Sequence, residues 1–319
     1  MTEVDVIDDN FILTVEPPND IFAEFVHHVA TTEGWAFQLN DYEIWKNCYP
    51  RHWLFMVQET GSEKYVASIS LAKSKLRDGS SLYTVAFFYC LVEYRNKGFG
   101  KLLFDKIQTI YGDHNCSLFG VGSMWKWYEK RYGFSHLQPY FHSAAVIQCK
   151  DLELQTSAQQ FRIELANVRI EDIEENIDKL IKYDKKLCEM EREQVIKQWL
   201  MAPGVCSKIA LNVDDDCVGF AAVREVSLNR LNISPLYADS PQIATKLLHT
   251  ILSNFDFLPF HTISTVFPSV NSSVLELLRP FCDGKVTISE FCRSQFTQQL
   301  FTVDEMKIFG IRHCAHGYV

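Results

Sequence analysis

Hydrophobic residues recur every three or four positions in some stretches of the chain and form short, nearly continuous runs in others. The first pattern predicts amphipathic helices and the second predicts buried strands. In the first half of the chain, the predicted helices span residues 21–33, 42–48, 98–111 and 124–132. The predicted strands span residues 53–57, 65–71, 81–92 and 117–121, followed by a hairpin pair within 134–149. The run at 81–92 is almost wholly apolar, which suits the centre of a sheet that is covered on both faces.

The same order of elements starts again near residue 170. The predicted helices of the second half span residues 170–187, 190–201 and 242–253, and the predicted strands span 208–213, 218–223 and 230–233. Two copies of one plan, each of ordinary domain size, indicate a tandem repeat rather than one large domain. We therefore predict an α/β fold with a mixed sheet (α+β in character) in two tandem domains, residues 1–150 and 151–319, with a linker over 155–160.

Composition places the chain among ordinary globular proteins. Of its 319 residues, 47% are hydrophobic and 22% are charged, and the net charge of −9 argues against a nucleic-acid-binding protein.

No apolar run approaches the ~18 residues that a membrane-spanning helix needs. The start of the chain is acidic and lacks the pattern of a secretory signal. The ten cysteines include no CxxC pair and predict reduced thiols, so we expect a cytoplasmic protein and leave the nucleus open.

Two short motifs contain metal-binding residue types. His313-Cys314-Ala315-His316 groups two imidazoles and a thiol, but no second half-site has zinc spacing. Asp214 to Asp216 lies between two predicted strands, and a solvated hairpin turn explains it better than a cation site. We therefore predict no metal in this protein.

The segment Arg95-Asn96-Lys97-Gly98-Phe99-Gly100-Lys101 lies between the apolar strand and an amphipathic helix. The first N–H groups of a helix have no backbone partner and carry partial positive charge, so such a loop binds anions. Glycines at 98 and 100 let a pyrophosphate approach the backbone without a Cβ in the way. The loop matches neither GxxxxGK[ST] nor GxGxxG, which argues against a P-loop and a dinucleotide fingerprint.

Residues 85–103 resemble the acyl-CoA-binding segment of the GNAT superfamily of N-acetyltransferases, a strand followed by [Arg/Gln]-x-x-Gly-x-[Gly/Ala] and a helix. Residues 128–134, with Gly133-Phe134 at the end of a helix, resemble the next block of that family. Tyr183-Asp184, Arg192, Trp199-Leu200 and 234–241 resemble the second domain of a tandem-GNAT group, acetyltransferase domain 18-like, with nematode and bacterial members. The resemblance covers nearly the whole chain and is silent on the substrate.

The resemblance implies acetyl-CoA, or coenzyme A, as co-substrate. Strand 116–121 is then expected to splay from strand 82–92 and open a cleft for the thioester. The pantetheine arm would lie along Phe88, Cys90, Leu91 and Val92. The pyrophosphate would be held by Arg95, Asn96, Lys97, Gly98, Phe99, Gly100 and Lys101.

The resemblance also implies a tyrosine acid on the helix before Gly133, and Tyr128 is the candidate. Tyr128 stands five residues before Gly133 rather than the usual four, and one residue turns a helix by ~100°. A core aromatic is therefore the alternative role for Tyr128. For the general base, Glu93 fits a solvated turn, and His114 and His142 are candidates among which we do not choose.

The second half lacks RxxGxG, and residues 232–241, with prolines at 235 and 241, occupy the place of the loop. This half is either a structural partner, or it lines a substrate pocket with Arg192, Tyr237 and Asp239. We predict an acetyl-CoA-dependent N-acetyltransferase acting on a small-molecule amine or an exposed amino group. A non-catalytic CoA-binding module and a protein lysine acetyltransferase are the alternatives. The tandem domains would form an intramolecular pseudo-dimer, and the oligomeric state stays open.

Overall fold

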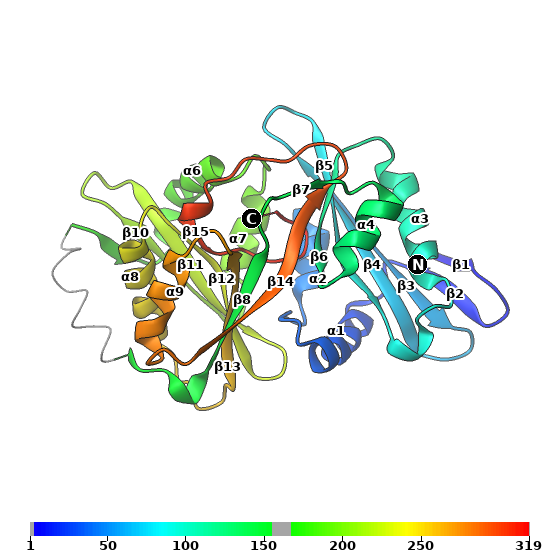
Figure 1. Cartoon of the computed structure of the whole chain (residues 1–319), viewed down its shortest axis with the longest axis horizontal. Helices are drawn as coiled ribbons and strands as arrows, with labels where there is room; N and C mark the ends of the chain where they lie inside the picture. Colours follow the sequence, from blue (N-terminus) through cyan, green and yellow to red (C-terminus); the bar gives the residue numbers. More distant parts are fainter. Residues whose placement is uncertain (1–2, 155–166, 319) are drawn as a thin grey trace.

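The computed structural model describes residues 3–154 and 167–318, and its strands form one strongly curved mixed sheet with helices on both faces (Figure 1). The linker predicted over 155–160 lies outside the described residues. In the first half, the helices are α1 (Asn19–Glu33), α2 (Asp41–Cys48), α3 (Phe99–Tyr111) and α4 (Met124–Tyr132). The strands are β1 (Glu3–Val6), β2 (Phe11–Val15), β3 (Arg51–Glu59), β4 (Tyr65–Lys75), β5 (Ser81–Cys90), β6 (Cys116–Val121), β7 (His136–Leu137) and β8 (His142–Gln148).

The second half repeats this order. Its helices are α6 (Ile177–Leu187), α7 (Glu193–Leu200), α8 (Pro241–Leu252) and α9 (Ser273–Leu278). Its strands are β9 (Arg169–Glu171), β10 (Val205–Leu211), β11 (Cys217–Val226), β12 (Arg230–Ala238), β13 (Thr262–Pro268), β14 (Val286–Phe296) and β15 (Ile308–Gly310). The predicted mixed α/β fold with two similar halves is confirmed.

Two predicted elements of the second half are wrong in their bounds. The helix expected from residue 170 begins only at Ile177, because Arg169–Glu171 pairs with β10 as an edge strand. Residues 232–238, expected to replace the glycine loop, continue strand β12 instead. Only Asp239 and Ser240 connect this strand to α8.

The two halves exchange strands, and this corrects the hairpin predicted within 134–149. β7 and β8 do not pair with each other among the described strands, and both pair with β14 from the far end of the chain. β14 lies between β6 and β8, while β8 also pairs with β13 along its whole length. The middle of the sheet in Figure 1 is therefore built from one strand of each half, lying side by side. The domain boundary at residue 150 stays a prediction.

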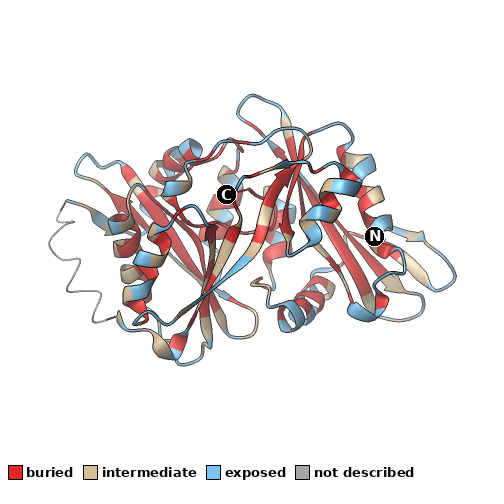
Figure 2. Ribbon diagram, in the orientation of Figure 1, coloured by how far each residue is buried: buried red, intermediate tan, exposed pale blue. Residues whose placement is uncertain are grey.

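The hydrophobic cores follow this exchange. One cluster joins the first half to α6 and α7 and includes Cys292 and Phe296 of β14. A second cluster lies under α8 and α9 and includes Ala145 and Ile147 of β8. Figure 2 shows the buried residues running along the strands from one side of the molecule to the other. Each half thus contributes a strand to the core of the other.

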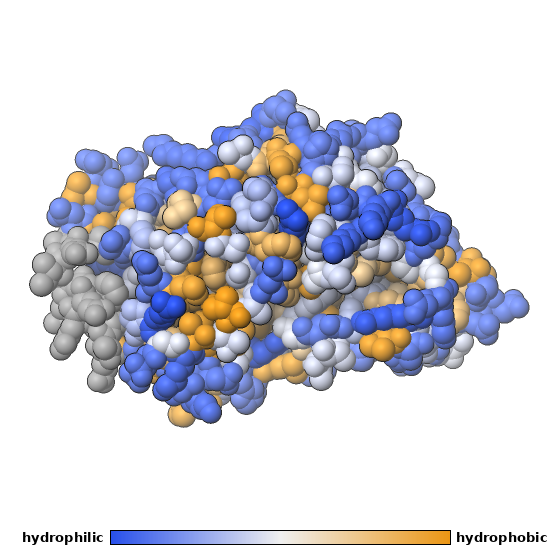
Figure 3. All heavy atoms as spheres, viewed as in Figure 1, coloured by the Kyte–Doolittle hydropathy of each residue, from blue (hydrophilic) through white to orange (hydrophobic). Residues whose placement is uncertain are grey.

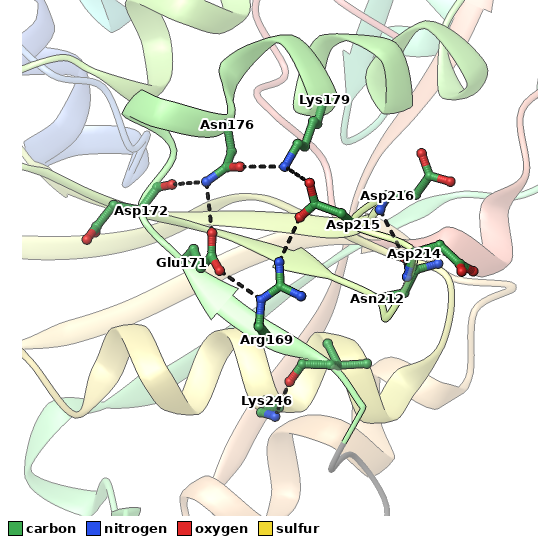
Figure 4. Close-up of polar contacts among 11 residues, drawn as sticks. Arg169, Glu171, Asp172, Asn176, Lys179, Asn212, Asp214, Asp215, Asp216 and Lys246 are labelled. Carbon is green, nitrogen blue, oxygen red and sulfur yellow. Dashed lines mark hydrogen bonds and ion pairs between the residues drawn. The ribbon is translucent and has the colours of Figure 1, made fainter.

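The acidic run Asp214–Asp216 forms the predicted turn between β10 and β11 (Figure 4). Asp215 lies between two cations and accepts hydrogen bonds from Arg169, at 2.7 Å, and from Lys179. The backbone N–H groups of Asp214 and Asp216 donate to the Asn212 side chain at 3.0 and 2.9 Å. The carboxylate of Asp215 is therefore neutralised by the protein itself.

Across the described residues, no three His, Cys, Asp or Glu side chains converge in the way that a metal ion requires. Within residues 3–154 and 167–318, none of the helices has the length and apolar content needed to cross a bilayer. All ten cysteines are free thiols.

Candidate functional site

Strands β5 and β6 diverge along their length and open a cleft in the first half of the sheet. They pair in parallel only near their beginnings, at Tyr83 with Cys116 and Thr84 with Ser117. Beyond Thr84 this edge of β5 has no neighbouring strand among the described residues. An unpaired strand edge presents N–H and C=O groups to an extended ligand. The predicted splay of these two strands is confirmed.

A bulge lies in β5 at the mouth of this cleft. On β4, Ser68 and Ser70 are two residues apart, but their partners Tyr89 and Ala86 on β5 are three apart. The extra residue gives Phe87 a left-handed φ of 52°. The Ser68 and Ser70 hydroxyls stabilise the bulge by donating hydrogen bonds to Phe87 O and Ala86 O, at 2.7 and 3.0 Å. Such bulges re-aim side chains and backbone groups next to sites.

The glycine loop that follows β5 leaves the start of α3 open. Gly98 is the N-cap residue with φ 93°, and it provides no side chain to bond the first N–H groups of the helix. A Cβ on Gly100 would lie 3.1 Å from Cζ of Phe88, so the Phe88 ring leaves little room for a side chain at this position. The uncapped N–H groups and the helix dipole make this end of α3 suited to an anion.

The basic residues of the loop are held by neighbours. Arg95 pairs with Glu33 at 3.0 Å and donates to Cys90 O at 3.1 Å. Lys97 lies 4.6 Å from the centre of the Tyr94 ring, and Lys101 pairs with Asp105. All three cations are themselves exposed at the surface of the loop.

A cavity of about 780 Å³ begins at this loop and continues between the two halves. Of the residues predicted from the sequence, seven line it: Phe88, Cys90, Arg95, Asn96, Phe99, Gly100 and Tyr128. The other five lie next to it without lining it: Leu91, Val92, Lys97, Gly98 and Lys101. Leu91 is buried in the core, and Val92 is 63% exposed. The residues marked by sequence reasoning are thus brought together at one end of one cavity.

Tyr128 lies on the buried face of α4, where it packs against Phe88 and Phe104 with ring centres 6.1 and 5.3 Å away. Its hydroxyl has no hydrogen-bond partner among the described residues. Burial raises the pKa of Tyr128, so the hydroxyl stays protonated. It is then a weaker acid than an ordinary thiol, whose pKa is about 8.5. The geometry suits a hydrogen-bond donor better than a group that gives its proton away completely.

None of the three candidate bases lines the cavity. His142 is 1% exposed beside Phe119 and Tyr140, and burial lowers its pKa to about 3. His114 is exposed and lies against the ring of Tyr83. Glu93 is exposed and pairs with Lys64.

The second half lines the cavity, which was one of the two alternatives from the sequence, but it does so with residues that the sequence reasoning did not name. Its contributions come from β12, β13, β14 and the C-terminal segment, and include Asn232, Thr265, Phe291, His313 and Cys314. In the sequence, the motif His313-Cys314-Ala315-His316 marked the C-terminal segment, but only as a metal motif. The structure shows that β12 and β13 pair at only two positions and diverge as β5 and β6 do, and no local sequence pattern indicates this.

The three second-half residues proposed for the pocket lie elsewhere. Arg192 is buried in an ion pair with Asp184 at 2.8 Å. Tyr237 is fully buried and accepts a hydrogen bond from the Arg312 backbone at 3.0 Å. Asp239 accepts from Tyr183 and pairs with Lys307. These side chains stabilise the second half, and none of them lines the cavity.

The second half also holds the first-half wall of the cavity in place. Arg230 donates hydrogen bonds to Gly34 O and Trp35 O, at 2.8 and 2.7 Å. His313 packs on the Phe37 ring at 4.8 Å and lies 3.2 Å from Ala36 O. Residues 34–37, between α1 and α2, therefore owe their position to residues nearly 200 or more positions later in the chain.

Comparison with known proteins agrees with this geometry. Residues 180–279 match the family model Acetyltransf_18, described as an acetyltransferase (GNAT) domain. The uncharacterized protein F36G3.2 of Caenorhabditis elegans is 24% identical over 245 residues, 74% of each chain. A putative acetyltransferase from Pyrococcus horikoshii is 16% identical, with a TM-score of 0.69 over 98% of both chains. A tandem GNAT protein from the clavulanic acid biosynthesis pathway is 12% identical, with a TM-score of 0.63 over 89% of this chain and 97% of its own.

At sequence identities of 16% and 12%, similarity to these two solved structures shows only that this chain shares their fold. The fold is that of GNAT proteins in tandem, and residues 180–279 of the second half are similar in sequence to a GNAT domain. The resemblance identified from the sequence is confirmed.

Proposed function

We propose that the chain is an N-acetyltransferase. The GNAT fold supports this proposal, because it fits an acyl-CoA-dependent acyltransferase. The chain transfers the acetyl group of acetyl-CoA to the primary amine of a small molecule. One observation carries the proposal: the uncapped start of α3 and the unpaired edge of β5 meet at one end of the same cavity.

The parts of acetyl-CoA fit different parts of this site. The pyrophosphate is an anion and suits the N–H groups at the start of α3, beside Arg95. The pantetheine arm carries two amides and suits the free edge of β5, where it would bond as a short extra strand. The thioester then lies in the cleft beyond Phe88, near Tyr128.

The reaction needs no group beyond the two substrates. The lone pair of the neutral amine forms a C–N bond to the thioester carbon, and the carbonyl oxygen becomes an oxyanion. Collapse of this intermediate breaks the C–S bond, and the thiolate leaves. The Tyr128 hydroxyl donates a hydrogen bond to the departing sulfur, while the proton lost by the amine finally neutralises the thiolate. Stabilising charge as it develops is how such a donor accelerates the reaction.

Calorimetry with acetyl-CoA and with CoA tests the binding part of the proposal. We expect a dissociation constant well below 1 mM. A constant of 1 mM corresponds to a binding free energy of about −4.1 kcal/mol, so the binding free energy should be more negative than this. The variant Gly100→Glu places an anion at the pyrophosphate site and should abolish binding. Gln108→Glu adds the same charge on the exposed side of the same helix and should leave binding intact. Equal affinities in the two variants would refute this placement of the cofactor.

A non-catalytic acetyl-CoA-binding protein is the second candidate. It is favoured by the absence of a free carboxylate: among the described residues that line the cavity, Glu33 is the only acid, and it pairs with Arg95. Acetyl-CoA binding without CoA release from any amine supports this candidate. Release that is confined to basic peptides and weakened by salt supports a lysine acetyltransferase instead.

A further inference from the structure

We infer that the acceptor is a primary amine carried on an apolar, uncharged body, without a carboxylate and without a second ammonium group. This inference rests on the proposed function and names the substrate class for the same site. The observation is the part of the cavity that leads away from the glycine loop and runs into the second half.

Apolar side chains from both halves form this part of the cavity. They are Phe119 of β6, Val146 of β8, Val266 of β13, Phe291 of β14 and Ile311, which follows β15. Figure 3 shows hydrophobic side chains gathered around the place where β8 and β14 lie side by side. An aromatic or aliphatic body loses its contact with water there and gains dispersion contacts, so the wall favours it.

Few charged side chains line the cavity, and those that do already have partners within the protein. Among the described lining residues, Glu33 and Arg95 are the acid and the guanidinium, and they pair with each other beside the glycine loop. His313 is the remaining titratable base, and burial lowers its pKa to about 3. Its Nδ1 accepts from the Ala315 N–H at 2.9 Å, so its Nε2 carries the proton towards Ala36 O. The imidazole is neutral and has no free nitrogen.

A charged substituent on the acceptor would therefore be buried without a partner. An amino acid brings a carboxylate, and a diamine brings a second ammonium group. Removing either ion from water without an opposite charge is costly. The reacting amine escapes this cost, because it must be neutral when it attacks the thioester.

The polar groups of the second-half wall are mostly occupied. Both donors of the Asn232 amide go to Ser264, at 3.1 Å to its backbone oxygen and 3.1 Å to its hydroxyl. Thr265 donates to Ile233 O at 3.1 Å. The oxygen of the Asn232 amide has no partner among the described residues and can accept one hydrogen bond. This wall suits an acceptor with at most a single donor on its apolar body, and it leaves the many hydroxyls of an aminosugar unpaired.

The first experiment measures CoA release by the wild-type chain with 2-phenylethylamine, phenylalanine, 1,4-diaminobutane, glucosamine and a lysine-containing basic peptide. We expect kcat/KM for 2-phenylethylamine to exceed each of the others by at least about tenfold. Preference for any charged or polyhydroxylated acceptor overturns the inference and leaves the proposed function standing. Absence of acetyl-CoA binding, or of CoA release from every amine, overturns the proposed function and the inference with it.

The second experiment reverses the preference. Asn232→Asp keeps the shape of the side chain and adds a carboxylate to the wall, so 1,4-diaminobutane should gain at least about tenfold in kcat/KM relative to 2-phenylethylamine. Asn254→Asp, in the exposed turn after α8, is the control and should change neither rate. If Asn232→Asp does not fold, Val146→Asp adds the same charge to the cavity from β8. A folded variant with an unchanged ratio contradicts the assignment of this wall to the acceptor.

Discussion

Tyr128 reaches the cavity although its position in the sequence is one residue away from the family pattern. The reason is the packing of α4: Tyr128 and Tyr132 share its buried face, four residues apart, and both pack against Phe104. Glu129, at the position that the pattern favours, is half-buried and does not line the cavity. The rotation of a helix on its sheet is set by which side chains it buries, and a motif count does not contain that information.

Replacing Tyr128 by Phe tests its role as a donor to the leaving sulfur. We expect kcat to fall about 10²-fold, the lower end of the range for such groups, with the affinity for acetyl-CoA unchanged. CoA-release kinetics and calorimetry measure the two quantities. The control is Tyr132→Phe, one turn along the same face, whose hydroxyl bonds Asp105 instead of lining the cavity. Similar rates for both variants assign Tyr128 to the core alone.

At the scale of elements, α3 and α8 show why we propose a cofactor site in only one of the two similar halves. Both follow a bulged central strand: the extra residue lies between Ala86 and Tyr89 in β5, and between Ile233 and Leu236 in β12. In the first half a glycine loop then leaves the helix start open. In the second half Ser240 caps α8, its hydroxyl accepting the Ile243 N–H at 3.3 Å. Pro241 at the first helical position also removes a donor.

The cap on α8 predicts a stability effect without a binding effect. Ser240→Ala should lower the free energy of unfolding by about 1 kcal/mol, because an N–H group of the helix loses its partner. Ser272→Ala is the matched control, since Ser272 precedes α9 without a side-chain cap bond. Urea unfolding compares the two, and acetyl-CoA affinity should stay constant in both. A larger loss in Ser272→Ala would show that the Ser240 bond is not what stabilises α8.

At the scale of the whole molecule, the halves are joined by buried polar contacts as well as by exchanged strands. Arg224 of β11 pairs with Asp41 of α2 at 2.7 Å, and both side chains are almost fully buried. The C-terminal segment enters the first half, where Nε2 of His316 lies 3.1 Å from Nε2 of His52 and Nδ1 of His316 donates a hydrogen bond to Thr84 O at 3.0 Å. Removing one member of a buried ion pair costs roughly 3–5 kcal/mol, because the other charge is left buried without a partner, so Arg224 and Asp41 depend on each other across the two halves.

The buried histidines make this arrangement sensitive to acid. Burial lowers the pKa of His142, His313 and His316 to about 3. The unfolded chain binds these protons near pH 6.5 and the folded chain only near pH 3. Between those values the unfolded state holds more protons, so stability falls as the pH falls. Each histidine contributes about 1.4 kcal/mol per pH unit in this window.

Urea unfolding from pH 7.5 to 5 measures this slope below pH 6.5, where the unfolded chain begins to bind the protons. His142→Leu removes one buried imidazole, whose Nδ1 has no partner among the described residues, and should reduce the slope by about 1.4 kcal/mol per pH unit. The exposed His27→Gln serves as control and should leave the slope unchanged. A stability that is independent of pH between 7.5 and 5 contradicts the prediction.

The sequence by itself determined the features that depend on near neighbours. Hydrophobic periodicity predicts most helices and strands, and the repeated order predicts two similar halves. Gly98 and Gly100, between an apolar strand and an amphipathic helix, predict the uncapped helix start that the structure has, because the backbone geometry of a helix start is local.

Only the tertiary structure decided which strands are exchanged and what encloses the cavity. β8 and β14 pair although well over 100 residues separate them, and Asn232 and His313 share a cavity with Tyr128. Such pairings depend on side chains that meet only after the chain has folded. Local periodicity carries no information about them, because it records which face of an element is buried and not which element covers it.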